Sequence, residues 1–351
     1  MSSKSFFKIF PTPRFLKFSY VGFEISGDTV RYAEVVNHDG KGISLGRHGE
    51  KKFKSEMDIF TNESLKSVLK EIAKIEKITH IKATLPEESN YLFTIPVQGD
   101  DVKAMRNSIE FHLEENVPIS GAEALFDFYV LPNQGGEKQA VVSVVSEPIV
   151  ENYISLFEEC GLTPVAFMAE SSSLSRSVIK KGDEETSLMV YLSEGKTVFS
   201  VVSGGYVQFS STLGVGGSVM TEALRKYFSV SEEEARAMKK EKGFSKDEDQ
   251  DLLSALVSAV SVLRDEVQRV VLYWHSHHDK ESKFPVKRII LIGSDAAIPG
   301  FAEYLSVSLK LPVEIGNVWE NFERYKKEVP PLHHAESLSF GACLGLSLTS
   351  L

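Results

Sequence analysis

The sequence predicts a duplicated α/β fold in which two similar halves face each other. Two strand-turn-strand units carry this prediction: VGFEISGDTVRYAEV near the N-terminus and MVYLSEGKTVFSVV near the middle of the chain. Residues 24–26 of the first unit align with residues 191–193 of the second, so that Glu24 corresponds to Tyr191. Each turn is small and polar and lies between two apolar strands. One such turn is a weak signal, but two of them, each opening one half of the chain, indicate an internal repeat.

Composition limits the classes of protein to consider. The chain has 351 residues, which suits two or more domains, and 25% of them are charged. The net charge is −10, yet residues 1–18 carry four cations and no acid, so removing these four positive charges leaves −14 for residues 19–351. A body this acidic is a poor nucleic-acid binder, and we expect no nucleic-acid partner.

Location is predicted from what the sequence lacks. No run of 18 apolar residues occurs, so we expect no transmembrane helix, and no apolar signal-peptide core is present near the N-terminus. The two cysteines, Cys160 and Cys343, cannot form a disulfide framework or a four-cysteine zinc site. A reducing cytoplasm is the simplest compartment.

Hydrophobic spacing gives the elements in order. The first half is predicted to contain paired strands over 20–36, a third strand over 41–54, a helix over 62–78 with apolar residues at helical spacing, and strands on either side of residues 86–88. A small α+β insertion follows, with a helix over 101–115, strands over 124–131 and 139–146, and a helix over 148–160. The second half is predicted to contain the strand pair within 187–213, helices over 218–228, 231–242 and 250–279, a buried strand over 286–293, a helix over 300–310, a strand over 312–315 and a small-residue helix over 335–349.

A nucleotide can lie between two halves of this kind. The backbone N–H groups of each turn are suited to phosphate oxygens, which requires small residues there. The candidates for the phosphate loops are Ser26, Gly27, Asp28, Ser193, Gly195 and Lys196, with Glu24 beside the first turn to organise magnesium and its waters. The turn after the buried strand, at Gly293 and Ser294, is the candidate for the adenosine side.

The chain resembles the PilM family, the actin-like proteins of type IV pilus assembly, which are similar to the cell-division protein FtsA. The first turn resembles that family's strand and D-I-G-S-S-S-V-K turn, and VVSVVSEPIVENYISLFEECGLTPVAFMAESSSLSRSV resembles its strand, helix and G-L-x-P segment. LGVGGSVMTEALRKYFSVSEEEARAMKK and RIILIGSDAAIPGFAEYLSVSLKLPVEI resemble two further segments, so that the similarity runs in order from about residue 20 to 349.

This resemblance implies an actin-like fold with an inserted SHS2 (1C) subdomain and ATP with magnesium between the halves. It assigns 1–18 to an N-terminal arm, 19–80, 166–186 and 335–351 to the first half (1A), 81–165 to the insertion, 187–218 and 286–334 to the second half (2A), and 219–285 to a helical subdomain (2B). It adds Gly216, Gly217, Glu233 and Lys240 to the adenosine side. Glu170, at a helix start where the family also has an acid, either faces the nucleotide and magnesium or stabilises the helix dipole. The implied partners are the N-terminal peptide of the membrane protein PilN, docked between the first subdomain and the insertion, and the pilus motor ATPase.

The chain departs from the family in all three loops. Glu24 and Ser26 replace an aspartate and a glycine, Tyr191 replaces an aspartate that would hold a magnesium water, and Glu194 places a negative charge near the phosphates. In the adenosine turn, the family's three glycines are Gly293, Ser294 and Asp295 here. Three alternatives therefore stay open: binding with hydrolysis, binding without hydrolysis, and a scaffold without nucleotide. We interpret the chain as a cytoplasmic scaffold at the inner face of the membrane, for type IV pili or a related type II secretion system, with a degenerate ATP cleft rather than an active enzyme. The alternatives are an active ATPase or kinase of the superfamily and an FtsA-like filament protein.

The N-terminal segment and a histidine cluster each have two interpretations. The basic, aromatic segment 1–18 is either a weak membrane contact or an arm that packs on the domain. His275, His277 and His278 form an H-x-H-H at a helix end, which favours a solvated helix terminus over a metal site.

Overall fold

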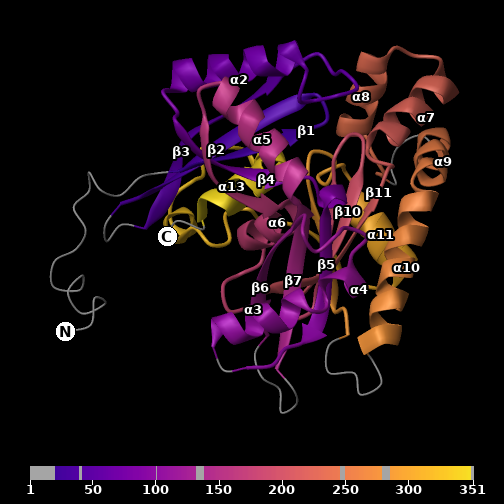
Figure 1. Cartoon of the computed structure of the whole chain (residues 1–351). Coiled ribbons are helices and arrows are strands. Elements are labelled where there is room, and N and C mark those ends of the chain that lie inside the picture. The colour runs from indigo at the N-terminus through magenta and orange to yellow at the C-terminus, as the bar shows by residue number, and fades with distance from the viewer. Residues whose placement is uncertain are drawn as a thin grey trace.

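Two five-stranded sheets with the same topology form the centre of the molecule (Figure 1). The computed structural model describes residues 20–38, 42–99, 101–131, 138–245, 250–278 and 285–348. The first sheet has the order β3-β2-β1-β4-β8. Its strands are β1 (Val21–Ser26), β2 (Thr29–Asn37), β3 (Ile43–Lys52), β4 (His80–Leu85) and β8 (Thr163–Ala169).

The second sheet repeats this plan in the order β11-β10-β9-β12-β13. Its strands are β9 (Ser187–Leu192), β10 (Thr197–Ser203), β11 (Tyr206–Leu213), β12 (Arg288–Ile292) and β13 (Val313–Ile315). In each sheet the first three strands in chain order pair antiparallel. A fourth strand pairs parallel to the first strand, and a fifth pairs parallel to the fourth. The duplicated α/β fold predicted from the two strand-turn-strand units is confirmed.

A third, antiparallel sheet belongs to the insertion. It has the order β5-β7-β6, built from β5 (Asn90–Pro96), β6 (Ala124–Val130) and β7 (Gln139–Ser146). The single helix expected over 101–115 is instead α3 (Val102–Glu110) followed by α4 (Leu113–Asn116). The helix is interrupted because the backbone of His112, at φ −107° and ψ 0°, leaves the helical region. At the start of α3, the Asp101 carboxylate accepts a hydrogen bond from Ala104 N at 2.8 Å, as expected for a cap.

The insertion also contacts the second lobe. The Tyr129 hydroxyl on β6 donates to the carbonyl oxygen of Val207 on β11. The Tyr129 ring stacks on Tyr206 with 4.5 Å between ring centroids. The insertion therefore bridges to the lobe that follows it in the chain.

The remaining helices cover the sheets and join the lobes. They are α2 (Glu63–Glu76), α5 (Glu147–Glu159), α6 (Glu170–Val178), α7 (Ser218–Phe228), α8 (Glu232–Glu241), α9 (Gln250–Ala259), α10 (Ser261–His278), α11 (Phe301–Leu309), α12 (His334–Ser337) and α13 (Gly341–Leu348), with short 3₁₀ segments η2 (Glu87–Ser89), η3 (Glu323–Lys326) and η4 (Leu338–Phe340).

Two helices expected to be continuous are divided. The helix predicted over 250–279 is α9 and α10, separated at Val260, which is buried. The interruption is local, because Val260 N still bonds Leu256 O and Arg264 N bonds Val260 O. The helix predicted over 335–349 is likewise divided into α12, η4 and α13.

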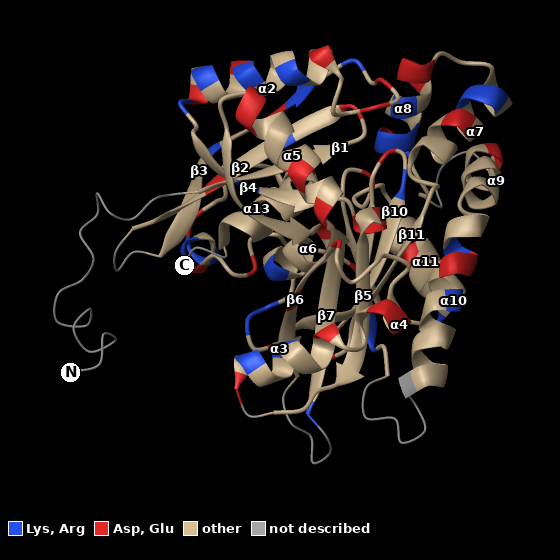
Figure 2. Cartoon of the chain, in the orientation of Figure 1, with Lys and Arg blue, Asp and Glu red and all other residues tan. Residues whose placement is uncertain are grey.

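The first lobe has its own core under α2. Asn62 caps α2 by accepting from Leu65 N at 2.9 Å, and the apolar positions of the helix face the sheet. Its outer face carries alternating charges (Figure 2). Tyr153 and Phe157 of α5 are buried in this same core, and β4 lies in the first sheet. The predicted insertion boundary of 81–165 stays a prediction.

Two small-residue helices, α6 and α13, pack between the lobes. A Cβ on Gly345 of α13 would lie 1.8 Å from the backbone oxygen of Ser173 on α6, so only glycine permits this approach. Ser173 Oγ donates to Ala342 O at 2.5 Å. This contact explains why the sequence near the C-terminus is rich in small residues.

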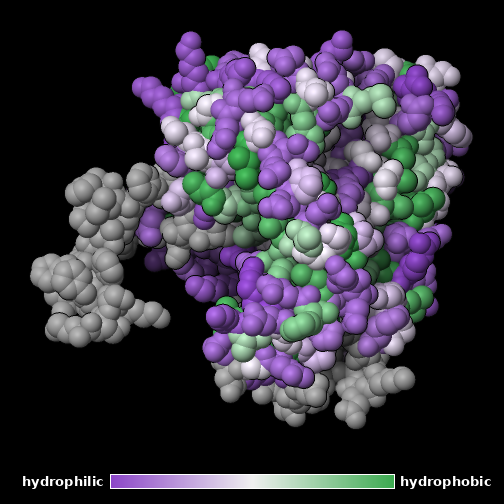
Figure 3. Space-filling model, in the orientation of Figure 1, coloured by the Kyte–Doolittle hydropathy of each residue, from purple (hydrophilic) through white to green (hydrophobic). Residues whose placement is uncertain are grey.

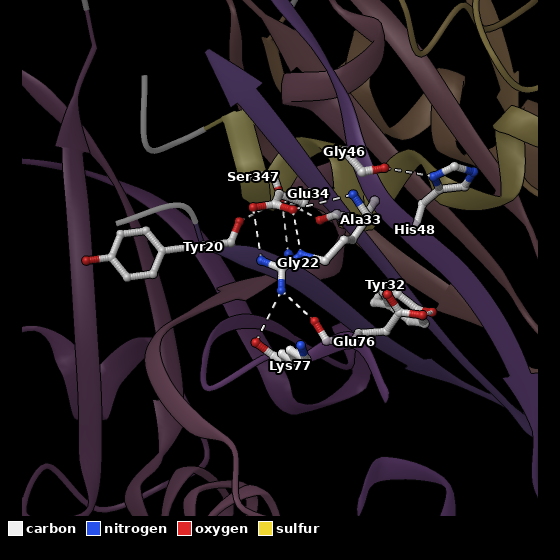
Figure 4. A network of polar contacts seen from close by, with 11 residues as sticks. Tyr20, Gly22, Tyr32, Ala33, Glu34, Gly46, His48, Glu76, Lys77 and Ser347 are labelled. Carbon is white, nitrogen blue, oxygen red and sulfur yellow. Dashed lines mark hydrogen bonds and ion pairs between the residues drawn. The ribbon is translucent and has the colours of Figure 1, made fainter. Parts of the chain in front are cut away.

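A polar network fixes α13 and the end of α2 to the first sheet (Figure 4). Ser347 Oγ donates to Ala33 O at 2.7 Å and accepts from Gly22 N at 3.0 Å. Arg47 Nε donates to Glu34 Oε2 at 2.7 Å, and Arg47 Nη1 donates to the carbonyl oxygen of Glu76 at 2.7 Å. The guanidinium therefore joins two strands to the end of α2 with charge-assisted hydrogen bonds.

Candidate functional site

A cleft of about 850 Å³ lies between the two lobes. The turns after β1, β9 and β12 all contribute to its wall, which is the arrangement expected when equivalent strand ends face each other. Of the residues predicted to bind nucleotide, the lining includes Ser26, Gly27, Asp28, Ser193, Gly195, Lys196, Lys240 and Ser294. Their role in binding a ligand stays a prediction.

The other predicted residues lie outside the lining. Glu233 is exposed on α8, whereas Glu24 and Glu170 are buried beneath the turns. Gly216, Gly217 and Gly293 serve close packing behind the cleft: a Cβ on Gly216 would lie 2.4 Å from the carbonyl oxygen of Ser193. Gly293 has φ +107° and approaches Leu192 O, so it also requires glycine.

A hydrogen bond between buried residues joins the lobes under the cleft. The Tyr191 hydroxyl donates to Glu24 Oε1 at 2.8 Å, and both side chains are buried. Arg31 Nη1 is 3.9 Å from Glu24 Oε2, an oxygen that has no hydrogen-bond partner. Burial raises the pKa of Glu24, against the opposing effects of Arg31 and Tyr191. Burial and the Glu24 charge raise the pKa of Tyr191 well above its usual range.

Lys196 makes a second connection between the lobes. Its ammonium lies 2.9 Å from Glu170 Oε2 and 2.9 Å from Glu88 Oε2, so a residue of the second lobe pairs with two acids of the first. Burial raises the pKa of Glu170 to about 7, although the charge of Lys196 opposes this shift. Burial by itself would lower the pKa of Lys196, but Glu170 and Glu88 raise it above its usual value.

Helix α8 supplies charged groups that the sequence analysis missed. Arg236 pairs with Glu194, which neutralises the acid that the second turn places near the cleft. Lys239 Nζ lies 2.8 Å from Asp295 Oδ1, and both side chains are buried. The signal that could have found them was the spacing of Arg236 and Lys239 on the same predicted helix as the candidate Lys240.

Ion pairs occupy most of the charged groups that line the cleft. Arg31 lies 3.1 Å from Glu50, and Lys52 lies 3.6 Å from Asp28 at an exposed position. Lys240 is exposed and has no ion pair among the residues that the structure describes. The cations best placed to meet an anionic ligand are therefore Lys52 and Lys240.

The described residues also bear on metal binding and on membrane spans. Over the described ranges, no group of three or more His, Cys, Asp or Glu side chains is arranged to hold a metal ion. His275 Nε2 accepts from Val286 N at 3.1 Å, and the ring of His277 stacks on Tyr273. Within the same part of the chain, no helix combines the length and the apolar character that crossing a bilayer requires. Residues 1–18 lie outside the described residues.

Two sheets of identical topology, with a cleft at the equivalent strand ends and a small inserted subdomain, define an actin-like protein. The family model of the type IV pilus assembly protein PilM matches residues 22–351, and the chain belongs to that family. No curated protein sequence gives a significant match.

Solved structures agree with this fold. A PilM–PilN type IV pilus biogenesis complex is similar with a TM-score of 0.74 and 18% identity, over 95% of this chain and 99% of that chain. MreB5 of Spiroplasma citri bound to AMPPNP has a TM-score of 0.56 and 12% identity, over 94% and 95%. The ethanolamine utilization protein EutJ from Carboxydothermus hydrogenoformans has a TM-score of 0.53 and 14% identity, over 96% and 91%. At these identities the likenesses show the fold alone.

Proposed function

We propose that this member of the PilM family is a cytoplasmic scaffold of type IV pilus assembly, held at the inner face of the membrane by a partner. The partner is the N-terminal peptide of a PilN-like membrane protein. The observation that carries the proposal is the family match over residues 22–351. A relative solved as a PilM–PilN complex, of which this chain covers 99%, supports the choice of partner.

The peptide would dock between the first lobe and the insertion. Strand β8 forms an edge of the first sheet and β6 an edge of the inserted sheet, and an extended peptide can add to such an edge. Val165 on β8 and Leu125 on β6 expose large apolar side chains. Figure 3 shows hydrophobic residues across the middle of one face, between the part that carries α2 and the part that carries α3.

The test is the affinity of a fluorescent PilN N-terminal peptide, measured by anisotropy. We expect Val165→Glu and Leu125→Glu each to weaken binding by about tenfold or more, because a charge replaces an apolar contact. The matched control is Val307→Glu, an exposed valine on α11 in the second lobe, which should bind as the original chain does. Unchanged affinity in both edge variants would overturn the docking site.

We propose further that the cleft holds adenine nucleotide without turning it over. Tyr191 and Lys196 connect the lobes beneath the turns and hold the lobes together. A ligand that contacts both lobes would favour this same arrangement of the lobes. Because the insertion also contacts β11, peptide and nucleotide would bind cooperatively. Equal peptide affinity with and without ATP would show that this coupling is absent. Steady ATP turnover that is lost in Glu24→Ala would overturn the non-enzymatic role.

Two weaker contacts complete the proposal. The scaffold would communicate with the pilus motor ATPase, and residues 1–18 would add a peripheral contact with anionic lipid through their cations. Pelleting with anionic vesicles tests the lipid contact. We expect a chain that begins at Ser19 to lose the pelleted fraction.

A further inference from the structure

The acids beneath the cleft already face cations from the protein itself. Glu24 and Glu170 are 1% and 3% exposed, and neither contributes to the cleft wall. The Lys196 ammonium lies 2.9 Å from Glu170 Oε2, and the Arg31 guanidinium lies 3.9 Å from Glu24 Oε2. The other oxygen of Glu24 accepts the Tyr191 hydroxyl. Each acid that the sequence suggests for magnesium is therefore already beside a cation or a hydrogen-bond donor of the protein itself.

This arrangement does not fit a magnesium ion. Mg²⁺ requires near-octahedral oxygen coordination and retains several of its waters, so it needs carboxylates that reach a water-filled space. Glu24 and Glu170 lie beneath the turns instead, and Lys196 and Arg31 would repel a divalent cation placed beside them. One oxygen of Glu24 lacks a hydrogen-bond partner, but the nearest charge to it is the Arg31 cation.

The open part of the cleft offers cations in place of a metal. Lys52 and Lys240 are exposed on opposite lobes, on β3 and α8, and both line the cleft. Lys196 also lines it, at the second turn. Ammonium groups at these three positions can contact the oxygens of a triphosphate, as lysines do at other phosphate sites. Lys52 and Lys196 would then share their charge with Asp28 and with the pair of Glu88 and Glu170.

We propose that the cleft binds ATP without a divalent metal, with Lys196 in the place that a metal ion would need. The inference rests on the proposed function, because it concerns the same cleft. It deepens that function by naming the groups that contact the phosphates. The three lysines hold the phosphates, and the Lys196 ammonium also keeps Glu88 and Glu170 paired.

The experiment is calorimetry with ATP on the full chain, once in excess magnesium and once in excess EDTA. We expect the two dissociation constants to agree within about threefold. Losing one charged contact would change the dissociation constant by more than that. A larger loss of affinity in EDTA overturns the inference and leaves the nucleotide part of the proposed function standing. Absence of binding in both buffers overturns both.

Variants test the role of the lysines. In EDTA, we expect Lys196→Met to weaken ATP binding by about tenfold or more, and Lys240→Met, at an exposed position that tolerates substitution, by several-fold. The matched control is Lys51→Met, because Lys51 pairs with Glu71 at 2.5 Å and lies outside the cleft lining. The inference is overturned if both Lys196→Met and Lys240→Met bind ATP as tightly as the original chain does. It is also overturned if Lys51→Met loses as much affinity for ATP as they do.

Discussion

Tyr191 and Glu24 occupy equivalent positions in the two halves of the repeat, and they are hydrogen-bonded to each other at 2.8 Å. Each residue lies on the first strand of its sheet, two positions before the turn serine. The replacement of an acid by tyrosine in the second half therefore gives the buried acid of the first half a donor. The pair therefore joins the two lobes through a buried hydrogen bond.

The Tyr191 hydroxyl should contribute measurably to stability. In Tyr191→Phe, Glu24 Oε1 loses its donor while it remains buried. We expect a loss of about 1–3 kcal/mol in the free energy of unfolding, the usual effect of leaving a buried polar group unpaired. Urea denaturation followed by circular dichroism measures the change.

Tyr206→Phe is the control for this prediction. Tyr206 is 37% exposed, and its ring stacking on Tyr129 is retained by phenylalanine. We expect its free energy of unfolding to stay within about 0.5 kcal/mol of the original chain. If the two variants lose equal stability, the hydrogen bond to Glu24 has no special role.

Stability should depend on pH through Glu170. Its pKa is raised from 4.5 to about 7 by burial, so between these values the folded state binds a proton that the unfolded state releases. The free energy of unfolding therefore falls as pH rises from about 4.5 to 7 and levels off above that, by up to about 3 kcal/mol. Denaturation at a series of pH values measures this slope.

Glu170→Gln separates this titration from others. Glu24 also has a raised pKa and lies near Glu170, so part of the slope belongs to it. We expect the glutamine variant to show a shallower fall between pH 5 and pH 7, the window that the two pKa values of Glu170 define. An unchanged slope in this variant would mean that Glu170 stays ionised when folded.

Local sequence patterns predicted the sheets well, for a physical reason. Strand alternation and small polar turns are short-range signals, and the repeat of residues 24–26 at residues 191–193 was enough to predict two equivalent sheets. The divided helices at residues 111–112 and at Val260 were missed because hydrophobic spacing continues across both points. Apolar periodicity does not reveal a single residue whose backbone angles leave the helical region.

The chemistry of the site was less predictable because it depends on distant pairs. Lys196 lines the cleft, but its partners Glu88 and Glu170 lie 108 and 26 positions away in the chain. Glu194 looked repulsive toward phosphate until the fold brought Arg236 against it. Long-range charge pairing follows from tertiary structure and cannot be read from a local motif.

Two glycines near the cleft provide a test of packing. A Cβ at Gly216 would lie within 2.4–2.6 Å of three backbone atoms of residues 193–196, whereas a Cβ at Gly195 would meet nothing within 4 Å. We therefore expect Gly216→Ala to lower the free energy of unfolding by about 1–3 kcal/mol, because backbone cannot move aside cheaply. Gly195→Ala, on the turn between β9 and β10, should change it by less than about 1 kcal/mol. Comparable denaturation midpoints for the two variants would contradict the packing described.

The ion pair of Lys239 and Asp295 should be costly to break but replaceable. The two charges lie 2.8 Å apart and are 3% and 7% exposed, and the ammonium also donates to Gly217 O at 3.2 Å. Lys239→Met leaves the Asp295 carboxylate buried without its partner, so we expect a loss of about 3–5 kcal/mol. In the double variant with Asp295→Leu, no charge remains buried, and an apolar pair of similar volume commonly restores most of the loss. Urea denaturation of the two single variants and the double variant gives the coupling energy, and strictly additive losses would show that the two charges do not stabilise each other.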